Sequence, residues 1–431
     1  LRILREGRPV QRRLTIPEGL TARQIAALTL RAEGHDGPVL LVGEEPEEPY
    51  RRPPLSKDLL LGRTPPERVR LRPTETWADQ NIDLRTGTTA VGLDPAARTV
   101  TLSDGSLVRY GRLLLATGGR PRPLPRSLLP GPRPRRVRAL RSLADALRLR
   151  DDLARAGSLL VIGAGLIGLE VAATARALGC EVTVLEAAGV PLSRVAPPWL
   201  GALYTELHRS NGVDLHMGVR LTRVREDGDS VTATADDGRS WSAALAVAAV
   251  GMVPETSLAA RSGVYVSTAP NGGIVVDEFC RTSTPDVFAA GDVTDQPHPL
   301  LGGHYRVEHW NNAQDQGAAA ARNMLGRRTA YAPEPWCWSE QYGTRLQICG
   351  WPAAADSYGE RRLTLRGDPS AMDFTAVFWR DGRVVGGVSA GRPAEFRALR
   401  RILATDPYPD FDALADPDTD LASLTPPVAS R

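Results

Sequence analysis

The sequence predicts an α/β fold with two Rossmann-like dinucleotide-binding domains, followed by an α+β C-terminal domain. Apolar, strand-like runs alternate with helical patterns along most of the chain, which is typical of proteins with parallel sheets. A strand, a tight turn and a helix start also occur twice in a nucleotide-binding arrangement, at 14–30 and 159–186. From Trp336 onward the pattern changes to antiparallel strands, which predicts the separate C-terminal domain.

The other elements are predicted in order along the chain from the same patterns. We expect helices at 20–32, 142–157 and 393–404, and strands at 37–45, at 112–119 and within 273–294. The Pro- and Arg-rich stretch 120–140 predicts an extended crossover with little regular structure. The last stretch, 405–431, is rich in Asp and Pro and is expected to be mobile.

Length and composition limit the class of protein. A chain of 431 residues is too long for one ordinary core, and 42% hydrophobic with 24% charged residues describes a soluble globular protein. No apolar run approaches ~20 residues, so no membrane span is expected, and no signal peptide is recognised after Leu1. The net charge of +3 gives no indication of nucleic-acid binding.

The cysteines and the single lysine support two further expectations. The four cysteines are scattered without a CxxC or metal-ligand spacing, so we expect reduced thiols, a cytoplasmic location and no bound metal. Lys57 is the only lysine among 53 Lys and Arg residues. A lysine retained in such an arginine-rich chain is favoured to act as a compact ammonium group, with chance as the alternative.

The turn in 159–186 has the features of a dinucleotide site. Gly163, Gly165 and Gly168 fit G-x-G-x-x-G between an apolar strand and a helix, where they allow a tight turn, the approach of a pyrophosphate and close helix packing. Glu186 ends the next strand, where a carboxylate binds the adenosine 2′-hydroxyl and repels a 2′-phosphate. These features predict NAD binding with NADH preferred over NADPH; a Rossmann-like unit without a ligand is the alternative.

The turn in 14–30 departs from this pattern. The positions that match the three glycines are Pro17, Gly19 and Ala22, and proline is unsuitable because it cannot take the glycine conformation and has no N–H group. Glu18 adds a negative charge at the helix start, where a pyrophosphate is expected. The turn therefore predicts weakened nucleotide binding, unless these first 18 residues come from an altered reading frame or a wrong start.

Further motifs occur in the order found in one family of flavoenzymes. They lie at 47–60 (EEPYRRPPLSKDLL), 113–122 (LLLATGGRPR), 248–256 (AAVGMVPET), 287–294 (VFAAGDVT), 305–326 and 335–350. With them, the chain from about residue 19 to 405 resembles the FAD-dependent, NADH-linked ferredoxin reductases that serve cytochrome P450s and aromatic-ring dioxygenases. Glutathione-reductase-type flavoenzymes are more distant relatives of that family.

The resemblance implies a domain layout, an activity and a partner. An FAD domain (1–122 and 250–326) would be interrupted by an NAD domain (123–249) and followed by a C-terminal reductase domain (327–410) and a flexible tail (411–431). The enzyme would pass electrons from NADH through FAD to a small iron–sulfur ferredoxin. Such acceptors are typically acidic, so the Arg-rich region 120–150 is expected to dock one, with a solvated crossover as the alternative.

The resemblance also assigns site residues. Lys57 and Glu170 are expected to be catalytic, Lys57 by stabilising the reduced flavin and Glu170 by lying beside the nicotinamide. Arg52 is expected to add positive charge near the reduced flavin together with Lys57. For Glu170 the alternative is a favourable place in the first turn of a helix, and for Trp310, expected at the flavin edge, it is packing between domains. The residues expected to bind the cofactors are Gly19, Glu44, Arg52, Lys57, Thr117, Gly118, Arg120, Gly163, Gly165, Gly168, Glu186, Gly251, Gly291, Asp292, Glu308 and Trp310.

Some positions depart from the family pattern besides Pro17 and Glu18. Cys337 stands where the family usually has an aromatic residue and Gly343 where it usually has an acid. Ser56 replaces the cysteine of the glutathione-reductase and peroxidase branches, which removes their thiol chemistry. A second hypothesis follows from the altered first turn: a divergent paralogue that binds FAD weakly or not at all and has another role. The sequence does not define the oligomeric state.

Overall fold

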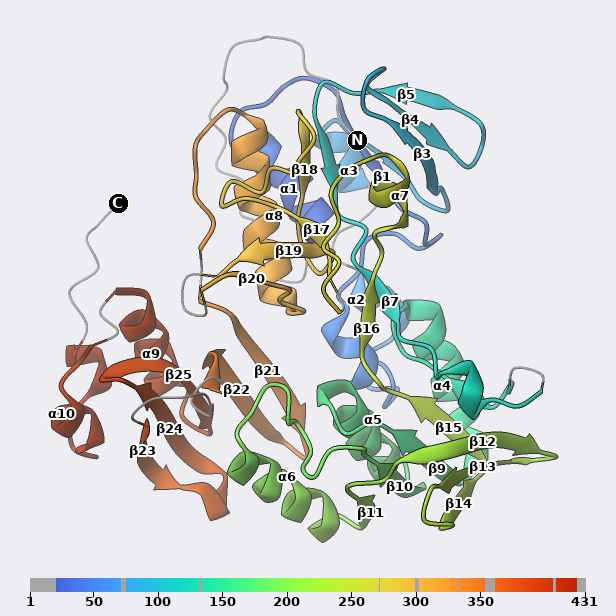
Figure 1. Ribbon diagram of the computed structural model, residues 1–431, viewed down its shortest axis with the longest axis vertical. Coiled ribbons are helices and arrows are strands. Elements are labelled where there is room, and N and C mark those ends of the chain that lie inside the picture. Colours follow the sequence, from blue (N-terminus) through green and yellow to red (C-terminus); the bar gives the residue numbers. More distant parts are fainter. Residues whose placement is uncertain are drawn as a thin grey trace. The chain divides into compact units, whose positions relative to one another are not determined.

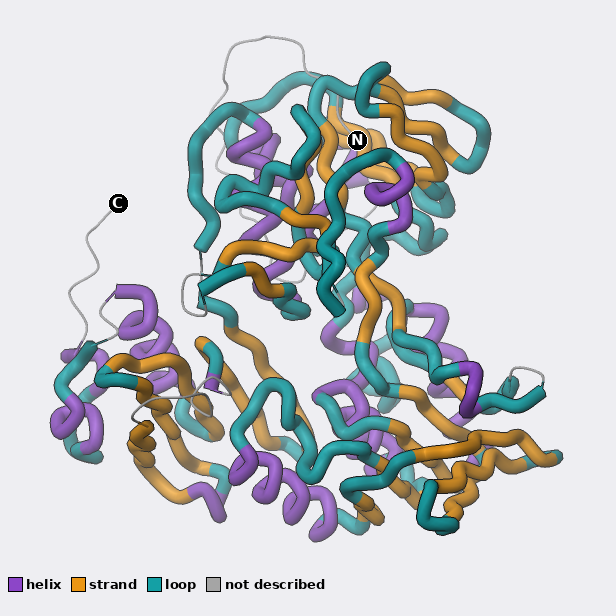
Figure 2. The backbone as a smooth tube through the Cα atoms, in the orientation of Figure 1, coloured by secondary structure: helices purple, strands orange, loops and turns teal. Residues whose placement is uncertain are grey.

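The computed structural model describes residues 21–70, 75–131, 134–270, 272–298, 302–332, 334–352, 361–405 and 408–424. The chain divides into two compact units. Unit 1 comprises Leu1–Pro54, Thr64–Arg120 and Met252–Pro333, and unit 2 comprises Leu55–Arg63, Pro121–Gly251 and Glu334–Arg431. Figure 2 distinguishes the helices, strands and loops of each unit.

Unit 1 is built around two helices that pack side by side, α1 (Ala22–Ala32) and α8 (Trp310–Met324) (Figure 1). They approach closely at Gly317, where a Cβ atom would lie 2.4 Å from the carbonyl oxygen of Ala22. The side chain of Gln24 accepts a hydrogen bond from the backbone N–H of Thr21 at 2.8 Å, which caps the start of α1. The close approach at Gly317 places α8 against the N-terminus of α1.

Unit 1 also contains several short sheets. Parallel pairs join β1 to β2, β6 to β18 and β17 to β19, and an antiparallel meander is formed by β3, β4 and β5. The elements of unit 1, besides α1 and α8, are β1 (Val39–Val42), α2 (Pro66–Val69), α3 (Glu75–Asp79), β2 (Ile82–Arg85), β3 (Ala90–Asp94), β4 (Thr99–Leu102), β5 (Leu107–Arg109), β6 (Leu113–Leu115), β7 (Gly119–Pro121, whose last residue belongs to unit 2), β16 (Met252–Pro254), α7 (Ser257–Arg261), β17 (Ile274–Val275), β18 (Val287–Ala289), β19 (Thr294–Pro297) and β20 (His304–Tyr305).

The nucleotide-binding part of unit 2 is a parallel sheet with the strand order β11-β10-β9-β15-β8. The chain order reverses between β9 and β15, which is where doubly wound sheets bind their ligands, at the carboxyl ends of the strands. The elements of this part are η2 (Arg126–Leu128), β8 (Val137–Arg138), α4 (Leu143–Ala156), β9 (Ser158–Ile162), α5 (Leu166–Ala177), β10 (Glu181–Leu185), α6 (Pro198–Ser210), β11 (Val213–His216), β12 (Leu221–Asp227), β13 (Ser230–Ala235), β14 (Ser240–Ala243) and β15 (Leu245–Ala248).

The C-terminal part of unit 2 is an antiparallel sheet with the order β21-β22-β25-β24-β23. Helix α9 packs on one face of this sheet. The side chain of Trp199 in α6 lies against Phe374 and Phe378 of β24. Its elements are β21 (Trp336–Gln341), β22 (Thr344–Gly350), β23 (Arg361–Asp368), η4 (Pro369–Ala371), β24 (Asp373–Arg380), β25 (Arg383–Ala390), α9 (Pro393–Thr405), α10 (Phe411–Ala415) and η5 (Leu421–Leu424). The antiparallel strands predicted from Trp336 onward are thereby confirmed.

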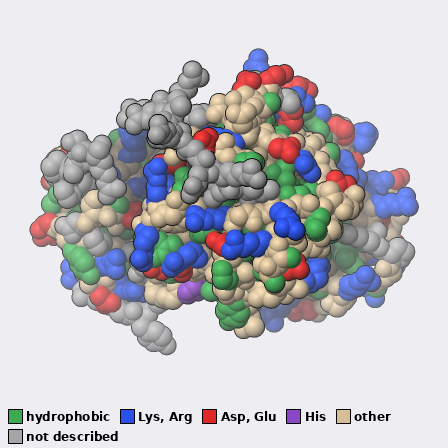
Figure 3. Space-filling model, turned by 90° about the horizontal axis from the view of Figure 1, so that it is seen from above, with side chains coloured by type: hydrophobic (Ala, Val, Ile, Leu, Met, Phe, Trp, Pro, Cys, Tyr) green, Lys and Arg blue, Asp and Glu red, His purple; other side chains and the backbone are tan. Residues whose placement is uncertain are grey.

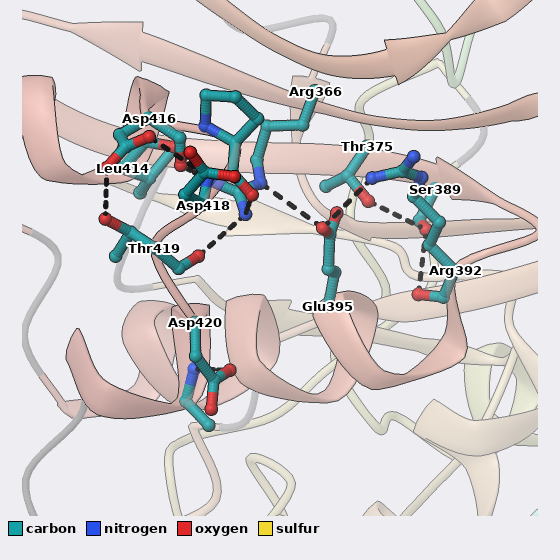
Figure 4. Close-up of polar contacts among 12 residues, drawn as sticks. Arg366, Thr375, Ser389, Arg392, Glu395, Leu414, Asp416, Asp418, Thr419 and Asp420 are labelled. Atoms are coloured by element: carbon teal, nitrogen blue, oxygen red, sulfur yellow. Dashed lines mark hydrogen bonds and ion pairs between the residues drawn. The ribbon is translucent and has the colours of Figure 1, made fainter.

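The segment after α9 differs from the flexible tail expected over 411–431. Through residue 424 it forms α10 and η5, and Leu414 and Leu421 are buried in the same core as α9. The guanidinium group of Arg366, which is only 3% exposed, donates hydrogen bonds to the carbonyl oxygens of Leu414, Asp416, Pro417 and Thr419 and pairs with Glu395 (Figure 4). The Asp- and Pro-rich composition of this segment did not indicate that Leu414 and Leu421 are buried. It also gave no sign that Arg366, which lies on β23, binds the carbonyl groups of the loop between them.

Two features are absent from the described part of the chain. No described helix is both long and apolar enough to cross a membrane. No three His, Cys, Asp or Glu side chains among the described residues are placed to hold a metal ion together. The four cysteines are free and buried.

Candidate functional site

The glycine turn after β9 has the geometry that the sequence predicts. Gly163 has a φ of +106°, and a Cβ atom there would lie 2.5 Å from the carbonyl oxygen of Ala249. A Cβ atom on Gly168 would lie 2.1 Å from the carbonyl oxygen of Gly163, so this glycine allows α5 to pack against the strand. Gly165 caps α5, and a Cβ atom built there would meet no neighbouring atom within 4 Å, so there is room beside the first turn of the helix. This arrangement fits a pyrophosphate.

Glu186 is held at the same turn by backbone amides. One carboxylate oxygen accepts a hydrogen bond from the N–H of Ala164 at 2.6 Å, and the other accepts from the N–H of Ala188 at 2.8 Å. Glu186 follows β10, the strand next to β9, so its carboxylate lies beside the glycine turn. The open helix end and the adjacent carboxylate together fit the adenosine diphosphate part of NAD.

Gly251 and an arginine that the sequence analysis did not single out lie near each other in unit 2. Gly251 has a φ of +99°, and the guanidinium of Arg194 lies 3.5 Å from the position of a Cβ atom there. No motif marks Arg194, because it follows β10 in an irregular loop. Its position beside Gly251 is therefore recognised only from the fold.

Lys57 and Glu170 form an ion pair inside unit 2. The Nζ atom of Lys57 lies 2.6 Å from a carboxylate oxygen of Glu170, and the Glu170 side chain is 3% exposed. The hydroxyl groups of Ser56 and Ser339 also donate to this carboxylate, at 2.5 and 2.7 Å. The structure therefore brings together the two residues predicted to be catalytic, and it adds two serines.

The alternative interpretation of Glu170 requires a correction. The sequence analysis placed this residue in the first turn of its helix, but α5 begins at Leu166 and its first turn holds no acidic residue. Stabilisation by the helix dipole falls off within the first turn, so it does not account for a buried carboxylate at Glu170. The hydrogen bonds and the ammonium group described above do.

In unit 1, a second charged cluster surrounds Arg52. Arg52 pairs with Glu45 and donates to the hydroxyl of Tyr50 at 3.2 Å, and that hydroxyl donates to Glu45. Burial and the nearby Arg52 lower the pKa of Arg23 below its usual value, and Glu45 and Tyr50 do not fully offset them. Two guanidinium groups thus repel each other electrostatically in unit 1, which fits an anionic ligand such as the pyrophosphate of FAD.

The turn that precedes Asp292 lies against α1 and α8. Gly291 has a φ of +85°, and its N–H group donates to the side-chain oxygen of Gln316 at 2.7 Å. The hydroxyl of Thr294 donates to the same oxygen at 2.9 Å. Burial lowers the pKa of Arg52, but Tyr50 and Glu45 raise it, so that the pKa lies above its usual value. Asp292 also raises this pKa, by a smaller amount. Asp292 and Arg52, predicted from separate motifs, therefore share one electrostatic environment.

Other predicted FAD-binding residues converge on Glu255, which the sequence analysis did not name. The hydroxyl of Thr117 donates to the carbonyl oxygen of Glu255 at 2.6 Å, and the N–H of Glu255 donates to the carbonyl oxygen of Gly118 at 2.9 Å. Arg120 pairs with the carboxylate of Glu255 at 2.6 Å and with Glu44 at 3.6 Å.

Three further predicted positions have different outcomes. Glu308 pairs with Arg306, and Trp310 is the first residue of α8. Gly19 lies outside the described residues, as do Pro17 and Glu18. The structure therefore does not describe the altered turn.

Comparison with protein families gives two matches that together span most of the chain. Residues 23–317 match the family described as pyridine nucleotide-disulphide oxidoreductase. Residues 336–425 match a reductase C-terminal domain, which includes α10 and η5.

Curated relatives are similar over nearly their whole length. The anthranilate 1,2-dioxygenase system ferredoxin–NAD(+) reductase component of Burkholderia cepacia is 39% identical over 411 residues, 94% of this chain and 97% of the relative. Rhodocoxin reductase of Rhodococcus erythropolis is 37% identical over 92% of this chain and 90% of its own. Putidaredoxin reductase CamA of Pseudomonas putida is 36% identical over 91% of each chain.

Solved structures agree with these relatives. The chain matches one in the covalent putidaredoxin reductase–putidaredoxin complex with a TM-score of 0.85 and 35% identity, over 94% of this chain and 95% of that one. It matches the ferredoxin reductase for the CYP199A2 system from Rhodopseudomonas palustris with a TM-score of 0.86 and 34% identity, over 93% and 96% of the two chains.

Proposed function

The chain belongs to the pyridine nucleotide-disulphide oxidoreductase family, and from this premise we propose that it is an FAD-dependent ferredoxin–NAD(+) reductase of an oxygenase system. It takes electrons from NADH and delivers them to a small iron–sulfur ferredoxin. The structural observation that carries the proposal is the buried Lys57–Glu170 pair in the unit that also presents the intact glycine turn. The relatives give no support to the alternative of a flavin-poor paralogue.

The proposed roles on the NAD side follow from the geometry of unit 2. Gly163, Gly165 and Gly168 shape the turn that receives the pyrophosphate. Glu186, fixed by two backbone amides, accepts the ribose 2′-hydroxyl and repels a 2′-phosphate, which favours NADH. Glu170 takes a place beside the nicotinamide and holds the ammonium group of Lys57.

The proposed roles on the FAD side follow from the charges of unit 1. Bound FAD supplies the conversion between two-electron and one-electron transfer. Arg52 and Arg23 offer positive charge to its pyrophosphate, and Asp292 is assigned to the ribityl chain. Lys57 stabilises negative charge on the reduced flavin. The other residues proposed to contact FAD are Gly19, Glu44, Thr117, Gly118, Arg120, Gly251, Gly291, Glu308 and Trp310.

A finer proposal concerns the docking of the ferredoxin on the Arg-rich region 120–150. Several of these arginines pair with carboxylates of the same unit, which lowers the positive potential available to an acidic partner. These pairs are Arg136 with Glu226 and Asp229, Arg138 with Asp152, Arg148 with Asp145 and Arg150 with Asp151. Figure 3 shows basic and acidic side chains interspersed on the face of the molecule that it draws. We therefore expect a weak, salt-sensitive contribution to docking from this region.

The proposed cytoplasmic location is supported by the four free cysteines, which suit a reducing compartment.

The experiment that tests the proposed function measures flavin binding. Purified protein is stripped of ligands, and FAD is then titrated in while flavin fluorescence is followed. We expect saturable binding, and we expect NADH to bleach the bound flavin under anaerobic conditions, as it does in flavin-dependent reductases. Absence of FAD binding at any concentration would overturn the proposal in favour of the flavin-poor paralogue.

A further inference from the structure

Glu170 receives a hydrogen bond or an ion pair on each of its two carboxylate oxygens. One oxygen accepts from Lys57 at 2.6 Å and Ser56 at 2.5 Å, and the other accepts from Ser339 at 2.7 Å. Ser339 is 1% exposed and lies on β21, whereas Glu170 lies on α5. A residue of the C-terminal domain thus contacts the carboxylate directly.

The hydrogen bond from Ser339 to Glu170 determines which group donates and which accepts in the neighbouring hydrogen bonds of Gln341 and His208. A serine hydroxyl has a single proton, and this one is donated to Glu170, so the Ser339 oxygen accepts from its other neighbour. That neighbour is the amide nitrogen of Gln341, at 2.9 Å. The amide oxygen of Gln341 then faces the Nε2 atom of His208 at 2.7 Å. Because an amide oxygen only accepts, His208 carries its proton on Nε2.

The hydrogen bond between His208 and Tyr342 has the same donor-to-acceptor direction. With Nε2 protonated and the ring neutral, Nδ1 accepts a hydrogen bond from the hydroxyl of Tyr342 at 3.1 Å. Burial lowers the pKa of His208 to about 4, with a smaller opposing effect of Gln341, so the ring is neutral near pH 7. Tyr342 and Gly343, with φ values of +51° and +76°, form the two-residue hairpin turn between β21 and β22. The turn places Tyr342 against His208, with ring centroids 5.1 Å apart.

Two ionisable groups that interact with Glu170 are uncharged. Burial, and then Glu170 itself, raise the pKa of Tyr204 well above its usual value and that of Cys337 to about 12, so both groups are neutral near pH 7. Lys57 is therefore the cation that balances the carboxylate, and hydroxyl groups supply the remaining hydrogen bonds. A buried carboxylate held this way depends on the placement of each donor.

We propose that Ser339, Gln341 and His208 are positioning residues that orient the carboxylate of Glu170 for its pairing with Lys57. The chain of donors runs in one direction, from Tyr342 through His208, Gln341 and Ser339 to Glu170. It links the hairpin of the C-terminal domain to the ion pair used in hydride transfer, and in that respect it rests on the proposed function. These residues act through Glu170 and do not themselves take part in the chemistry.

The first test is independent of flavin and of activity. Histidine labelled with ¹⁵N is incorporated into flavin-free protein, and His208→Gln identifies the His208 signals among the six histidines. We expect a neutral ring protonated on Nε2. In Gln341→Glu the new carboxylate faces both His208 and Ser339, so we expect His208 to become doubly protonated at pH 7. A parent ring protonated on Nδ1, or an unchanged ring in Gln341→Glu, would overturn the proposed direction.

The second test measures flavin reduction by NADH in a rapid-mixing experiment. Ser339→Ala removes the donor, and we expect the reduction rate to fall about tenfold, as for loss of one hydrogen bond to a charged group, with the dissociation constant of NADH changed by less than about twofold. Ser339→Thr keeps a hydroxyl and is expected to recover most of the rate. Thr375→Val is the matched control, because it removes a buried hydroxyl contact to Ser389 in the same sheet without touching Glu170 (Figure 4).

The outcomes separate this inference from the proposed function. An equal loss of rate in Ser339→Ala and Thr375→Val would show a general effect on the C-terminal sheet and overturn the inference. The midpoint potential of bound FAD gives a further comparison, since we expect it to shift in Ser339→Ala and not in Thr375→Val. If the parent bound no flavin, the proposed function would fail, and the labelled-histidine experiment would still decide whether the chain of donors exists.

Discussion

The charged clusters of the two units differ in how the charges of their own side chains are balanced. In unit 2, Lys57 and Glu170 pair directly, and neutral hydroxyl groups satisfy the rest of the carboxylate. In unit 1, Arg52 and Glu45 also pair, but the neighbouring Arg23 keeps a lowered pKa because burial and Arg52 disfavour its charge. The first cluster is balanced by residues of the chain, whereas the second retains repulsion that a bound anion would relieve. Under the proposed function, the first cluster holds the reactive pair and the second receives the phosphate groups of FAD.

The largest expected effect comes from removing the cation of the balanced cluster. Lys57→Met leaves Glu170 buried without its partner, which costs about 3–5 kcal/mol in comparable buried pairs. We expect a large fall in thermal stability together with a fall in the rate of flavin reduction of roughly a hundredfold or more. Urea unfolding and rapid mixing with NADH measure the two effects. Lys57→Met combined with Glu170→Gln should be more stable than Lys57→Met alone; additive losses would show that the pair is not coupled.

The next effect concerns the altered turn, whose residues lie outside the described part of the chain. If Glu18 lies ~5 Å from the pyrophosphate, two unit charges repel by ~3 kcal/mol at an effective dielectric constant near 20. Replacing Pro17 and Glu18 with glycine should then raise FAD affinity by up to roughly a hundredfold. Titration of FAD against both proteins checks this. Equal affinities in a tightly binding parent would show that 14–30 is not the flavin turn.

A smaller effect should distinguish the unit 1 cluster by its sign. Arg23→Gln removes the repulsion with Arg52, so flavin-free protein should be as stable as the parent or more stable. The same change should weaken FAD binding about tenfold, because a charge-assisted contact is lost. Arg51, which is exposed, provides the control as Arg51→Gln. Destabilisation of the flavin-free protein by Arg23→Gln would contradict the idea that burial and Arg52 disfavour the charge of Arg23.

The choice of nicotinamide should respond to Glu186. Its carboxylate is fixed by the N–H groups of Ala164 and Ala188, so Glu186→Ala removes both the 2′-hydroxyl contact and the repulsion of a 2′-phosphate. We expect kcat/KM for NADH to fall and that for NADPH to rise, narrowing the gap about tenfold. Equal kcat/KM values for the two cofactors in the parent would refute the assignment.

The last prediction is a dependence of stability on pH. Burial lowers the pKa of His208 and of His298 to about 4. The unfolded chain binds these protons near pH 6.5 and the folded chain does not, so the free energy of unfolding should fall as pH decreases from about 6.5 to about 4. Each histidine contributes up to about 3 kcal/mol to this loss. His208→Gln should flatten the profile measured by urea unfolding; an unchanged slope would contradict the neutral buried state.

The sequence predicts those parts of the molecule whose signals are local. Three glycines within one turn, and Glu186 at the end of the next strand, predict a dinucleotide-binding turn, and the structure has the close backbone contacts that this pattern requires. Family motifs placed Lys57 and Glu170, but their contact with each other depends on segments more than a hundred residues apart. Contacts of this kind have no sequence period, because folding brings unrelated positions together.

The positioning residues and the C-terminal segment show why the rest was missed. Ser339 and Gln341 occupy inward positions of β21 and alternate with exposed or half-buried neighbours, so they look like ordinary polar residues of an edge strand. His208 lies on α6 and carries no motif. In the segment after α9, Asp and Pro indicated mobility, but Leu414, Leu421 and the distant Arg366 fix the chain. Polar networks assembled from several elements are recognised only from the fold.

The most direct test of the account is electron transfer to a ferredoxin. Flavin-free protein is divided, one half is reloaded with FAD, and both halves are mixed with NADH and an oxidised [2Fe–2S] ferredoxin under anaerobic conditions. Reduction of the iron–sulfur centre is followed by its loss of visible absorbance. The account predicts rapid reduction that requires FAD and is much slower with Lys57→Met. Equal reduction with and without FAD, or none with FAD bound, would contradict it.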